Sequence, residues 1–330
     1  MKWISDLLSA PDSLMRRVAL IYNPVSGQHR NGYATAVEQA AEVLREAGIE
    51  AEILSTQGPG TGSALARQAV SEGCDTVLAC GGDGTVNEVL QSLVGGQAAL
   101  GVVPMGTANA LAADLGLSAP PASAARALLS AEPVRISVGK ISFHDRSGAV
   151  RSRYFTVAAG VGADGQFFYR LDANLKRRFG YAAYLMEAFR LWSTHRFPYF
   201  EAALTSPGGA EARVEQVSQL LAVRIGNFGG VVRNLVPGAA LRNRNLRLIA
   251  FKTRSRYRYL RFIAAVLFRR HTFSSDIEST AAVTVECSLC NGSSERVLVE
   301  ADGDLLGSLP ARIELVPDAL TLLIPNHPGS

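Results

Sequence analysis

The segment Thr76-Val77-Leu78-Ala79-Cys80-Gly81-Gly82-Asp83-Gly84-Thr85 is the most informative part of the sequence. An apolar run passes directly into a glycine-rich loop, and a helical pattern, Val86 to Val94, follows. Glycine tolerates positive φ and lets backbone amides come close to a ligand, and the start of a helix offers unpaired N–H groups and a positive dipole end. This order of strand, loop and helix predicts a phosphate site, where Asp83 could hold Mg²⁺ against the phosphates.

Short apolar runs alternate with helical patterns from residue 18 to about residue 115. The runs cover residues 18–22, 49–55, 76–80 and 100–103, and glycines close the helical patterns at 33–47, 63–72 and 86–94. Such an alternation predicts a three-layer α/β domain with a parallel sheet. We expect an N-terminal segment at 1–15 and this α/β domain at 16–133, to which the tail 318–330 could return.

Beyond residue 134 the pattern changes to strands without regular helices between them. The β-rich stretches are 134–143, 154–159, 217–225, 246–251, 281–286 and 296–300. They predict a second domain at 134–317, an antiparallel, sandwich-like structure that two helical insertions interrupt near 167–194 and 257–270.

Three loops follow strands of the first domain: Asn23–Gly27, Gly81–Thr85 and Pro104–Asn109. The carboxyl ends of parallel strands meet at one edge of a sheet, where ligands bind. Any one of these loops could be a plain turn rich in Gly, Pro and Asn. Three such loops at the same edge of the sheet favour a ligand-binding crevice over three unrelated turns.

Charge is distributed unevenly along the chain. The formal net charge is +4, yet residues 217–275 contain no Asp or Glu and twelve Arg or Lys. This asymmetry predicts an anionic partner, either membrane headgroups or nucleic acid, and no nucleic-acid-binding module accompanies it. The segment from Arg254 to Arg270 is basic and aromatic, and as an amphipathic helix it could lie on a membrane or simply present a solvated face.

Other sequence features restrict the class of protein. No apolar run approaches the roughly 20 residues of a membrane-spanning helix, and the N-terminus lacks a signal-peptide pattern. Four scattered cysteines are too few for a disulfide framework and predict buried thiols in a reducing cytoplasm.

Three motifs carry a family resemblance. They are Asn23-Pro24-x-Ser26-Gly27, Gly81-Gly82-Asp83-Gly84-Thr85-Val86-Asn87-Glu88-Val89 and Pro104-x-Gly106-Thr107-x-Asn109. They resemble the nucleotide-binding motifs of the diacylglycerol kinase catalytic-domain superfamily, which includes sphingosine kinases and bacterial lipid kinases. The similarity continues into the second domain, as far as Glu300-Ala301-Asp302-Gly303-Asp304.

The resemblance implies roles for particular residues. Asp302 would be the general base, Asp83 and Asp304 would hold Mg²⁺, and Asp164 would meet the lipid head group or, alternatively, cap a helix. The residues implied to bind ATP are Asn23, Ser26, Gly27, Thr56, Gly81, Gly82, Asp83, Gly84, Thr85, Asn87, Glu88, Gly106, Thr107 and Asn109. By itself, Asp302-Gly303-Asp304 is more typical of a turn.

The chain also departs from the family pattern. Asp304 stands where the family often has Glu, and Ala110 follows Asn109 where many bacterial members have Asp. Residues 243–247 read Asn-Arg-Asn-Leu-Arg in place of acidic residues, so no structural magnesium site is expected there.

The resulting prediction is a lipid kinase that transfers the γ-phosphoryl group of ATP to diacylglycerol or a sphingoid-like lipid. We expect it to be cytoplasmic, peripheral at the inner membrane face through basic residues 242–270, and not to bind nucleic acid. The alternatives are an NAD kinase, which shares the Gly-Gly-Asp-Gly-Thr loop, and a catalytically weak lipid-binding or regulatory protein. A homodimer and the identity of the lipid stay open.

Overall fold

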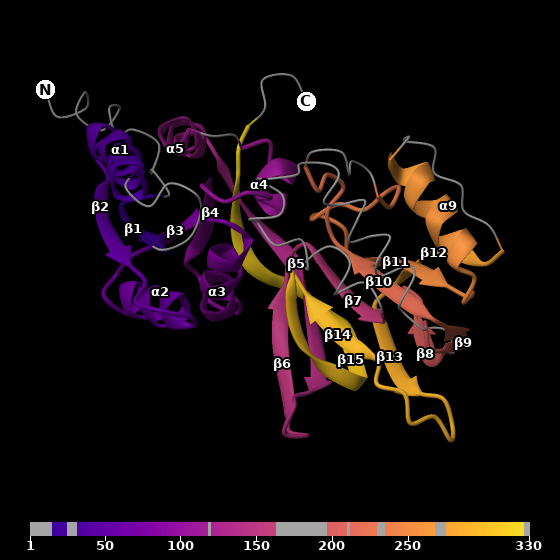
Figure 1. Ribbon diagram of the computed structural model, residues 1–330. Coiled ribbons are helices and arrows are strands. Elements are labelled where there is room, and N and C mark those ends of the chain that lie inside the picture. Colours follow the sequence, from indigo (N-terminus) through magenta and orange to yellow (C-terminus); the bar gives the residue numbers. More distant parts are fainter. Residues whose placement is uncertain are drawn as a thin grey trace, which may run out of the picture. The chain divides into compact units, whose positions relative to one another are not determined.

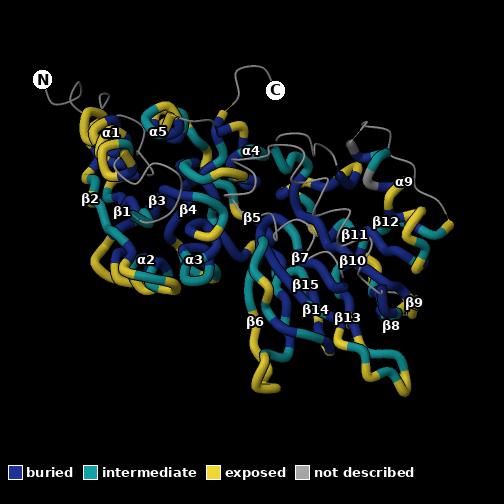
Figure 2. The backbone as a smooth tube through the Cα atoms, viewed as in Figure 1, coloured by how far each residue is buried: buried dark blue, intermediate teal, exposed yellow. Residues whose placement is uncertain are grey.

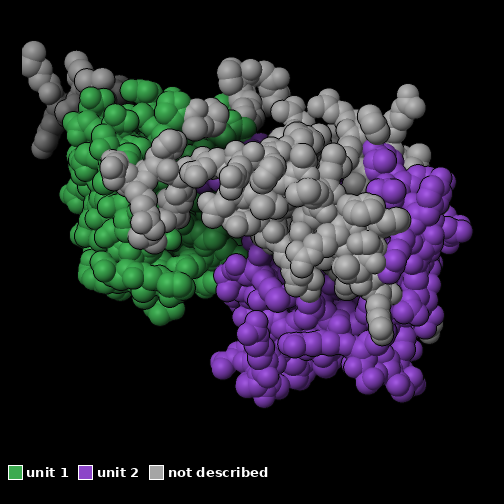
Figure 3. Space-filling model, in the orientation of Figure 1, with its two compact units in different colours: residues 1–105, 115–135, 320–330 green, residues 106–114, 136–319 purple. Residues whose placement is uncertain are grey.

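The computed structural model describes residues 15–24, 32–117, 120–162, 197–209, 212–229, 235–267 and 275–326. The chain divides into two compact units, coloured separately in Figure 3. Unit 1 comprises residues 1–105, 115–135 and 320–330, and unit 2 comprises residues 106–114 and 136–319. The long strand β15 (Asp304–Ile324) begins in unit 2 and ends in unit 1.

Unit 1 is a parallel sheet with helices on both faces, as the sequence pattern predicts. Its strands are β1 (Arg17–Tyr22), β2 (Glu50–Ser55), β3 (Thr76–Gly81) and β4 (Ala99–Pro104), in the order β2-β1-β3-β4. The end of β15 adds a further parallel strand beside β4, with Leu322 opposite Leu100. Every residue of β3 and β4 is buried, which explains their uninterrupted apolar sequences.

Four helices cover this sheet, and they pack in pairs. Helices α1 (Tyr33–Glu46) and α5 (Pro121–Leu129) lie on one side of the strands, and α2 (Thr61–Ser71) and α3 (Asp83–Leu93) lie on the other (Figure 1). The sequence pattern placed the start of α3 at Val86, whereas the helix begins three residues earlier. Gly82 has an extended backbone and links β3 to the helix. Asp83 is favourable in the first turn because its negative charge interacts with the positive end of the helix dipole.

Unit 2 is an antiparallel β-sandwich preceded by the short helix α4 (Ala110–Asp114). One sheet has the order β12-β11-β10-β7-β14-β15, and the other runs β9-β8-β13-β15-β5-β6, so β15 belongs to both. The strands are β5 (Glu132–His144), β6 (Val150–Phe155), β7 (Ala158–Gly162), β8 (Phe200–Thr205), β9 (Arg213–Val217), β10 (Gln219–Val223), β11 (Leu246–Phe251), β12 (Ile277–Ala282), β13 (Thr284–Leu289) and β14 (Leu298–Ala301).

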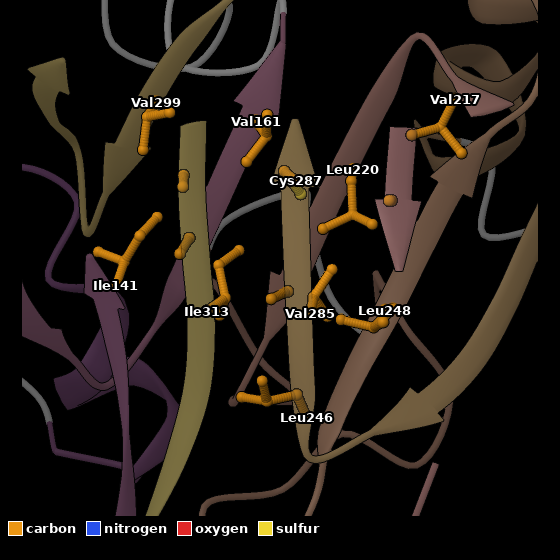
Figure 4. Close-up of a cluster of buried hydrophobic side chains, with 14 of the residues drawn as sticks. Ile141, Val161, Val217, Leu220, Leu246, Leu248, Val285, Cys287, Val299 and Ile313 are labelled. Atoms are coloured by element: carbon orange, nitrogen blue, oxygen red, sulfur yellow. The ribbon is translucent and has the colours of Figure 1, made fainter. Parts of the chain in front are cut away.

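The core of the sandwich lies between its two sheets. Alternate residues of both sheets point inward, among them Ile141, Val161, Leu220, Val285 and Ile313 (Figure 4). A second apolar cluster lies outside the first sheet, where helix α9 (Arg256–Leu267) packs against β10 and β11. Figure 2 shows how closely burial follows these layers in each unit.

The predicted fold class, an α/β nucleotide-type domain followed by a β-rich domain, is confirmed. Some details differ. The single strand predicted at 154–159 is two strands, β6 and β7, and β8, β9 and β15 were not predicted. The predicted helical insertion at 167–194 lies outside the described residues.

Cysteine burial agrees with the prediction of free thiols, since Cys74, Cys80 and Cys287 are buried and Cys290 is partly exposed. Within the described ranges, no helix has both the length and the apolar character needed to cross a membrane.

Candidate active site

In unit 1, the predicted nucleotide residues gather at the carboxyl ends of the parallel strands. The register places Tyr22 of β1 beside Ser55 of β2 and Cys80 of β3, so the loops that follow these strands start at one edge. Asn23 directly follows β1, and buried Thr56, which follows β2, donates its backbone N–H to the Tyr22 carbonyl at 2.9 Å. Ser26 and Gly27 lie outside the described residues.

The glycine-rich loop closes tightly onto the first turn of α3. A Cβ on Gly81 would lie 2.4 Å from Thr85 Oγ1, so the loop requires glycine there for the Thr85 side chain to pack. Gly82 precedes the helix and has no side chain to cap it, while the first N–H groups of a helix have no intrahelical acceptor. The start of α3 therefore directs backbone donors and a positive dipole end at this edge.

Gly84 differs from Gly81, because a Cβ at Gly84 would meet no protein atom within 4 Å. Its φ also lies outside the left-handed region that favours glycine. Neither packing nor backbone conformation requires glycine at this exposed position. A ligand that approaches the backbone closely would account for it.

Asn87 and Glu88 lie one turn further along α3 and contact protein groups. Asn87 is 1% exposed, and its Oδ1 accepts a hydrogen bond from Gln91 Nε2 at 2.7 Å. The Glu88 carboxylate accepts the backbone N–H groups of Gly60 at 2.8 Å and Gly62 at 2.9 Å. Glu88 thus binds the start of α2 and fixes α2 to α3.

The third motif belongs to unit 2 from Gly106 onward. Asn109 has a φ of 51° and closes its own loop: its Oδ1 accepts the Gly106 N–H at 2.9 Å, and its Nδ2 donates to the Gly106 carbonyl at 2.8 Å. Thr107 is an exposed residue of this loop. The hydrogen bonds of Asn109 hold the loop rigid directly before α4.

Asp302 lies in the two-residue turn that joins β14 to β15. Asp302 and Gly303 have φ values of 42° and 92°, and Ala301 pairs with Asp304 across the turn, so the turn expected from an Asp-Gly pair is present. The Asp302 carboxylate is buried and accepts three backbone N–H groups at 2.9 Å, from Thr156, Val157 and Ala158. These donors fix the carboxylate in one orientation.

Asp304, the other predicted metal ligand of unit 2, forms an ion pair with Arg153 Nη2 at 2.7 Å. Arg153 thus binds one carboxylate oxygen of Asp304, Oδ2, and a metal ion at that oxygen would compete with this guanidinium. No cluster of three or more metal-ligating side chains occurs in the part of the chain that the structure describes. Asp164, the predicted contact of the lipid head group, is not among the described residues.

The residues present fit a nucleoside triphosphate and Mg²⁺ better than a preformed metal cage. Mg²⁺ at phosphate-transfer sites is commonly held by one or two carboxylates together with the substrate phosphates. Asp83, in the first turn of α3, suits that role next to the exposed Gly84.

Sequence reasoning missed two parts of this arrangement. The donors to Asp302 are backbone amides of residues 156–158, which leave no signature in the sequence. Asp114 was also missed. Its Oδ1 accepts the N–H groups of Gly226 at 3.0 Å and Asn227 at 2.8 Å, and burial raises its pKa.

Comparison with known proteins is consistent with this architecture. Residues 17–141 match the family described as the diacylglycerol kinase catalytic domain. Residues 156–324, more than half of the chain, match the YegS C-terminal NAD kinase beta sandwich-like domain.

Similar proteins cover nearly the whole chain. A diacylglycerol kinase of Mycobacterium tuberculosis (strain ATCC 25618 / H37Rv) is 30% identical over 316 residues, which is 94% of this chain and 96% of the relative. A diacylglycerol kinase of Bacillus subtilis (strain 168) is 26% identical over 90% of this chain and 92% of its own length. A solved structure of a diacylglycerol kinase from Bacillus anthracis str. Sterne has the same fold, with a TM-score of 0.67, 20% identity and coverage of 94% and 97%.

The chain therefore belongs to the diacylglycerol kinase catalytic-domain family.

Proposed function

We propose that this chain is an ATP- and Mg²⁺-dependent lipid kinase that phosphorylates a hydroxyl group of diacylglycerol or a sphingoid-like lipid. The observation that carries the proposal is the start of α3, where glycines that directly follow a buried parallel strand present backbone donors and the Asp83 carboxylate together. Family membership supports the same activity, and the names of the relatives support a diacylglycerol substrate.

The proposed roles follow from the chemistry of phosphoryl transfer. Backbone N–H groups at the start of α3 bind and orient the phosphates, and Asp83 holds Mg²⁺, which neutralises charge on the phosphates when bound. The lipid oxygen forms a bond to the γ-phosphorus, the bond to the bridging oxygen breaks with its electron pair leaving on ADP, and the hydroxyl proton passes to Asp302. Three amide donors orient the Asp302 carboxylate.

One assay tests the reaction: radiolabelled ATP offered with diacylglycerol, monoacylglycerol, sphingosine, ceramide or phosphatidylglycerol, and separately with NAD. We expect a labelled phospholipid and no NADP. Asp302→Asn should lower the rate by about 100-fold or more, the usual contribution of a general base. Glu286→Gln, which neutralises an exposed carboxylate of the same unit, is the matched control and should retain full activity.

Two results would contradict the proposal. NADP formation without a lipid product would assign the chain to the NAD kinase alternative. Lipid binding without any labelled product, in the presence of Mg²⁺ and ATP, would favour the regulatory alternative.

Gly84→Ala separates a ligand role of the loop from a structural one. The added methyl group meets no protein atom, and alanine favours a helix more than glycine does, so the melting temperature should stay equal or rise. If phosphates approach the backbone here, the KM for ATP should increase by about tenfold or more. An unchanged KM for ATP would show that the phosphates do not bind close to Gly84.

A further inference from the structure

One face of helix α9 is buried against the strands of unit 2. Tyr259, Phe262 and Val266 are buried against the outside of β10 and β11. The Tyr259 ring stacks on Phe251 at 4.7 Å between centroids, and Phe262 meets Phe251 edge-on at 5.1 Å. The Tyr259 hydroxyl also lies 2.8 Å from Ser218 Oγ. These contacts fix the rotation of α9 about its own axis.

The opposite face of α9 carries a second apolar stripe. Tyr257, Leu260 and Ala264 are three and four residues apart, so they lie along one line of the helix, away from the buried residues. Tyr257 is 70% exposed and Leu260 is 48% exposed. The outer face of α9 therefore carries two large exposed apolar side chains one turn apart, in addition to the buried apolar face.

Arginines border this outer stripe. Arg256 and Arg261 are exposed on either side of it. Arg258 forms an ion pair with Asp276, and Arg254 donates to the Phe197 carbonyl and lies over the Tyr199 ring. Arg261 makes no ion pair with any residue that the structure describes. The outer face of α9 therefore joins exposed apolar side chains to positive charge, within a region, 217–275, that lacks any Asp or Glu.

We propose that the outer face of α9, defined by Tyr257, Leu260 and Ala264 with Arg256 and Arg261 beside them, docks on the surface of an anionic lipid bilayer. Aromatic and aliphatic side chains enter the boundary between headgroups and acyl chains, and flanking arginines bind the anionic headgroups. A nucleic acid would bind the arginines but would not use the exposed side chain of Leu260. Figure 1 shows where α9 lies. The choice of a membrane rests on the proposed lipid substrate, but docking itself requires no catalysis.

Vesicle sedimentation without nucleotide tests the apolar part of this face. The protein should pellet with vesicles of equal parts phosphatidylglycerol and phosphatidylcholine, and much less with phosphatidylcholine alone. Tyr257→Ser/Leu260→Ser should weaken binding by about tenfold or more. The matched control, Val150→Ser/Val214→Ser, removes side chains that are 68% and 64% exposed on strands of the same unit and should bind as the wild type does. Equal binding by both double variants would overturn the proposal.

The charged part is tested in the same way. Arg256→Gln/Arg261→Gln should weaken binding by roughly fivefold per arginine, and added salt should weaken the wild type as well. Arg67→Gln/Arg126→Gln removes the same charge from exposed positions on α2 and α5 and should leave binding unchanged. Failure of the wild type to bind anionic vesicles would overturn the proposal even if kinase activity is found. So would binding to duplex DNA alone, or a dimer that Tyr257→Ser/Leu260→Ser dissociates.

Discussion

Arg224 is the largest fully buried side chain of unit 2, and it binds only carbonyl oxygens among the described residues. Its guanidinium donates to the carbonyls of Asn243 and Asn245 through Nη1 and to those of Ser137 and Leu241 through Nη2, at 2.7–2.9 Å. Burial lowers its pKa to about 10, so the group stays charged at neutral pH. The Arg224 guanidinium thus binds three carbonyls of the loop of residues 241–245. This loop has no pair of acidic residues that could bind a metal ion.

This arrangement predicts that Arg224→Met destabilises unit 2 by about 2–4 kcal/mol, because four buried or part-buried carbonyls lose a charged donor. The backbone N–H of Arg224 also donates to the Val157 carbonyl, next to the amides that hold Asp302. Urea unfolding measures the loss. Arg312→Met, which breaks an exposed ion pair, should cost less than about 1 kcal/mol, and equal losses in the two variants would refute the role of Arg224.

At the scale of elements, Glu88 connects two helices that are distant in sequence. Its carboxylate lies at the start of α2, where a negative charge is favourable, and Gly62 leaves room for it because a Cβ there would approach Glu88 Oε2 to 2.8 Å. Glu88→Ala should therefore cost about 1 kcal/mol, as the loss of a helix cap does. Faster hydrogen exchange of the Gly60 and Gly62 amides would show that the start of α2 has lost this contact. Glu46→Ala, at the exposed end of α1, should change neither quantity.

Asp114 links α4 to residues 226 and 227, and its raised pKa gives that contact a pH dependence. Burial disfavours the ionised form, so the folded protein binds more protons than the unfolded chain between the unfolded pKa, near 3.8, and the raised folded value. The contribution of Asp114 to stability is therefore largest at low pH and decreases as pH rises through that window.

Asp114→Asn should remove this dependence, because the amide oxygen can still accept both N–H groups without carrying charge. The variant should be at least as stable as the wild type at pH 7, as measured by thermal unfolding across a pH series. A variant that is less stable at pH 7 would show that the charge itself strengthens the contact.

The elements also show what the sequence could and could not predict. Strands β3 and β4 were evident because both of their faces are buried, which leaves uninterrupted apolar runs. β9 reads Arg213-Val-Glu-Gln-Val and is largely exposed, and β15 contains Pro310 and Pro317, residues that normally argue against a strand. At the site, Asp302 could be identified from its motif, but its amide donors and the partner of Asp304, Arg153, lie about 150 residues away.

For the molecule as a whole, the last strand of the sheet in unit 1 comes from the C-terminal end of the sequence. Leu320, Leu322 and Leu323 are at most 1% exposed. The part of β15 that pairs with β4 follows the residues of unit 2 in the sequence. A Cβ on Gly101 of β4 would clash with Leu78 of β3 and would lie 3.3 Å from Leu323 Cδ1, so glycine here leaves room for the leucines of both neighbouring strands. Arg135 Nη1 donates to Thr321 Oγ1 at 3.1 Å, and Asn326 Nδ2 donates to the Ser130 carbonyl at 2.8 Å.

Leu322→Ala should consequently destabilise unit 1 by about 2–5 kcal/mol, the range for a buried leucine truncated in a packed core. Its first effect should be lost hydrogen-exchange protection along β4, at Leu100 and its neighbours, because this strand loses its partner's packing. Leu305→Ala, in the same strand but 51% exposed and in unit 2, should leave β4 protected. If both variants left the exchange of β4 unchanged, the returning strand would contribute little to unit 1, and residues 17–135 would have to hold their sheet together alone.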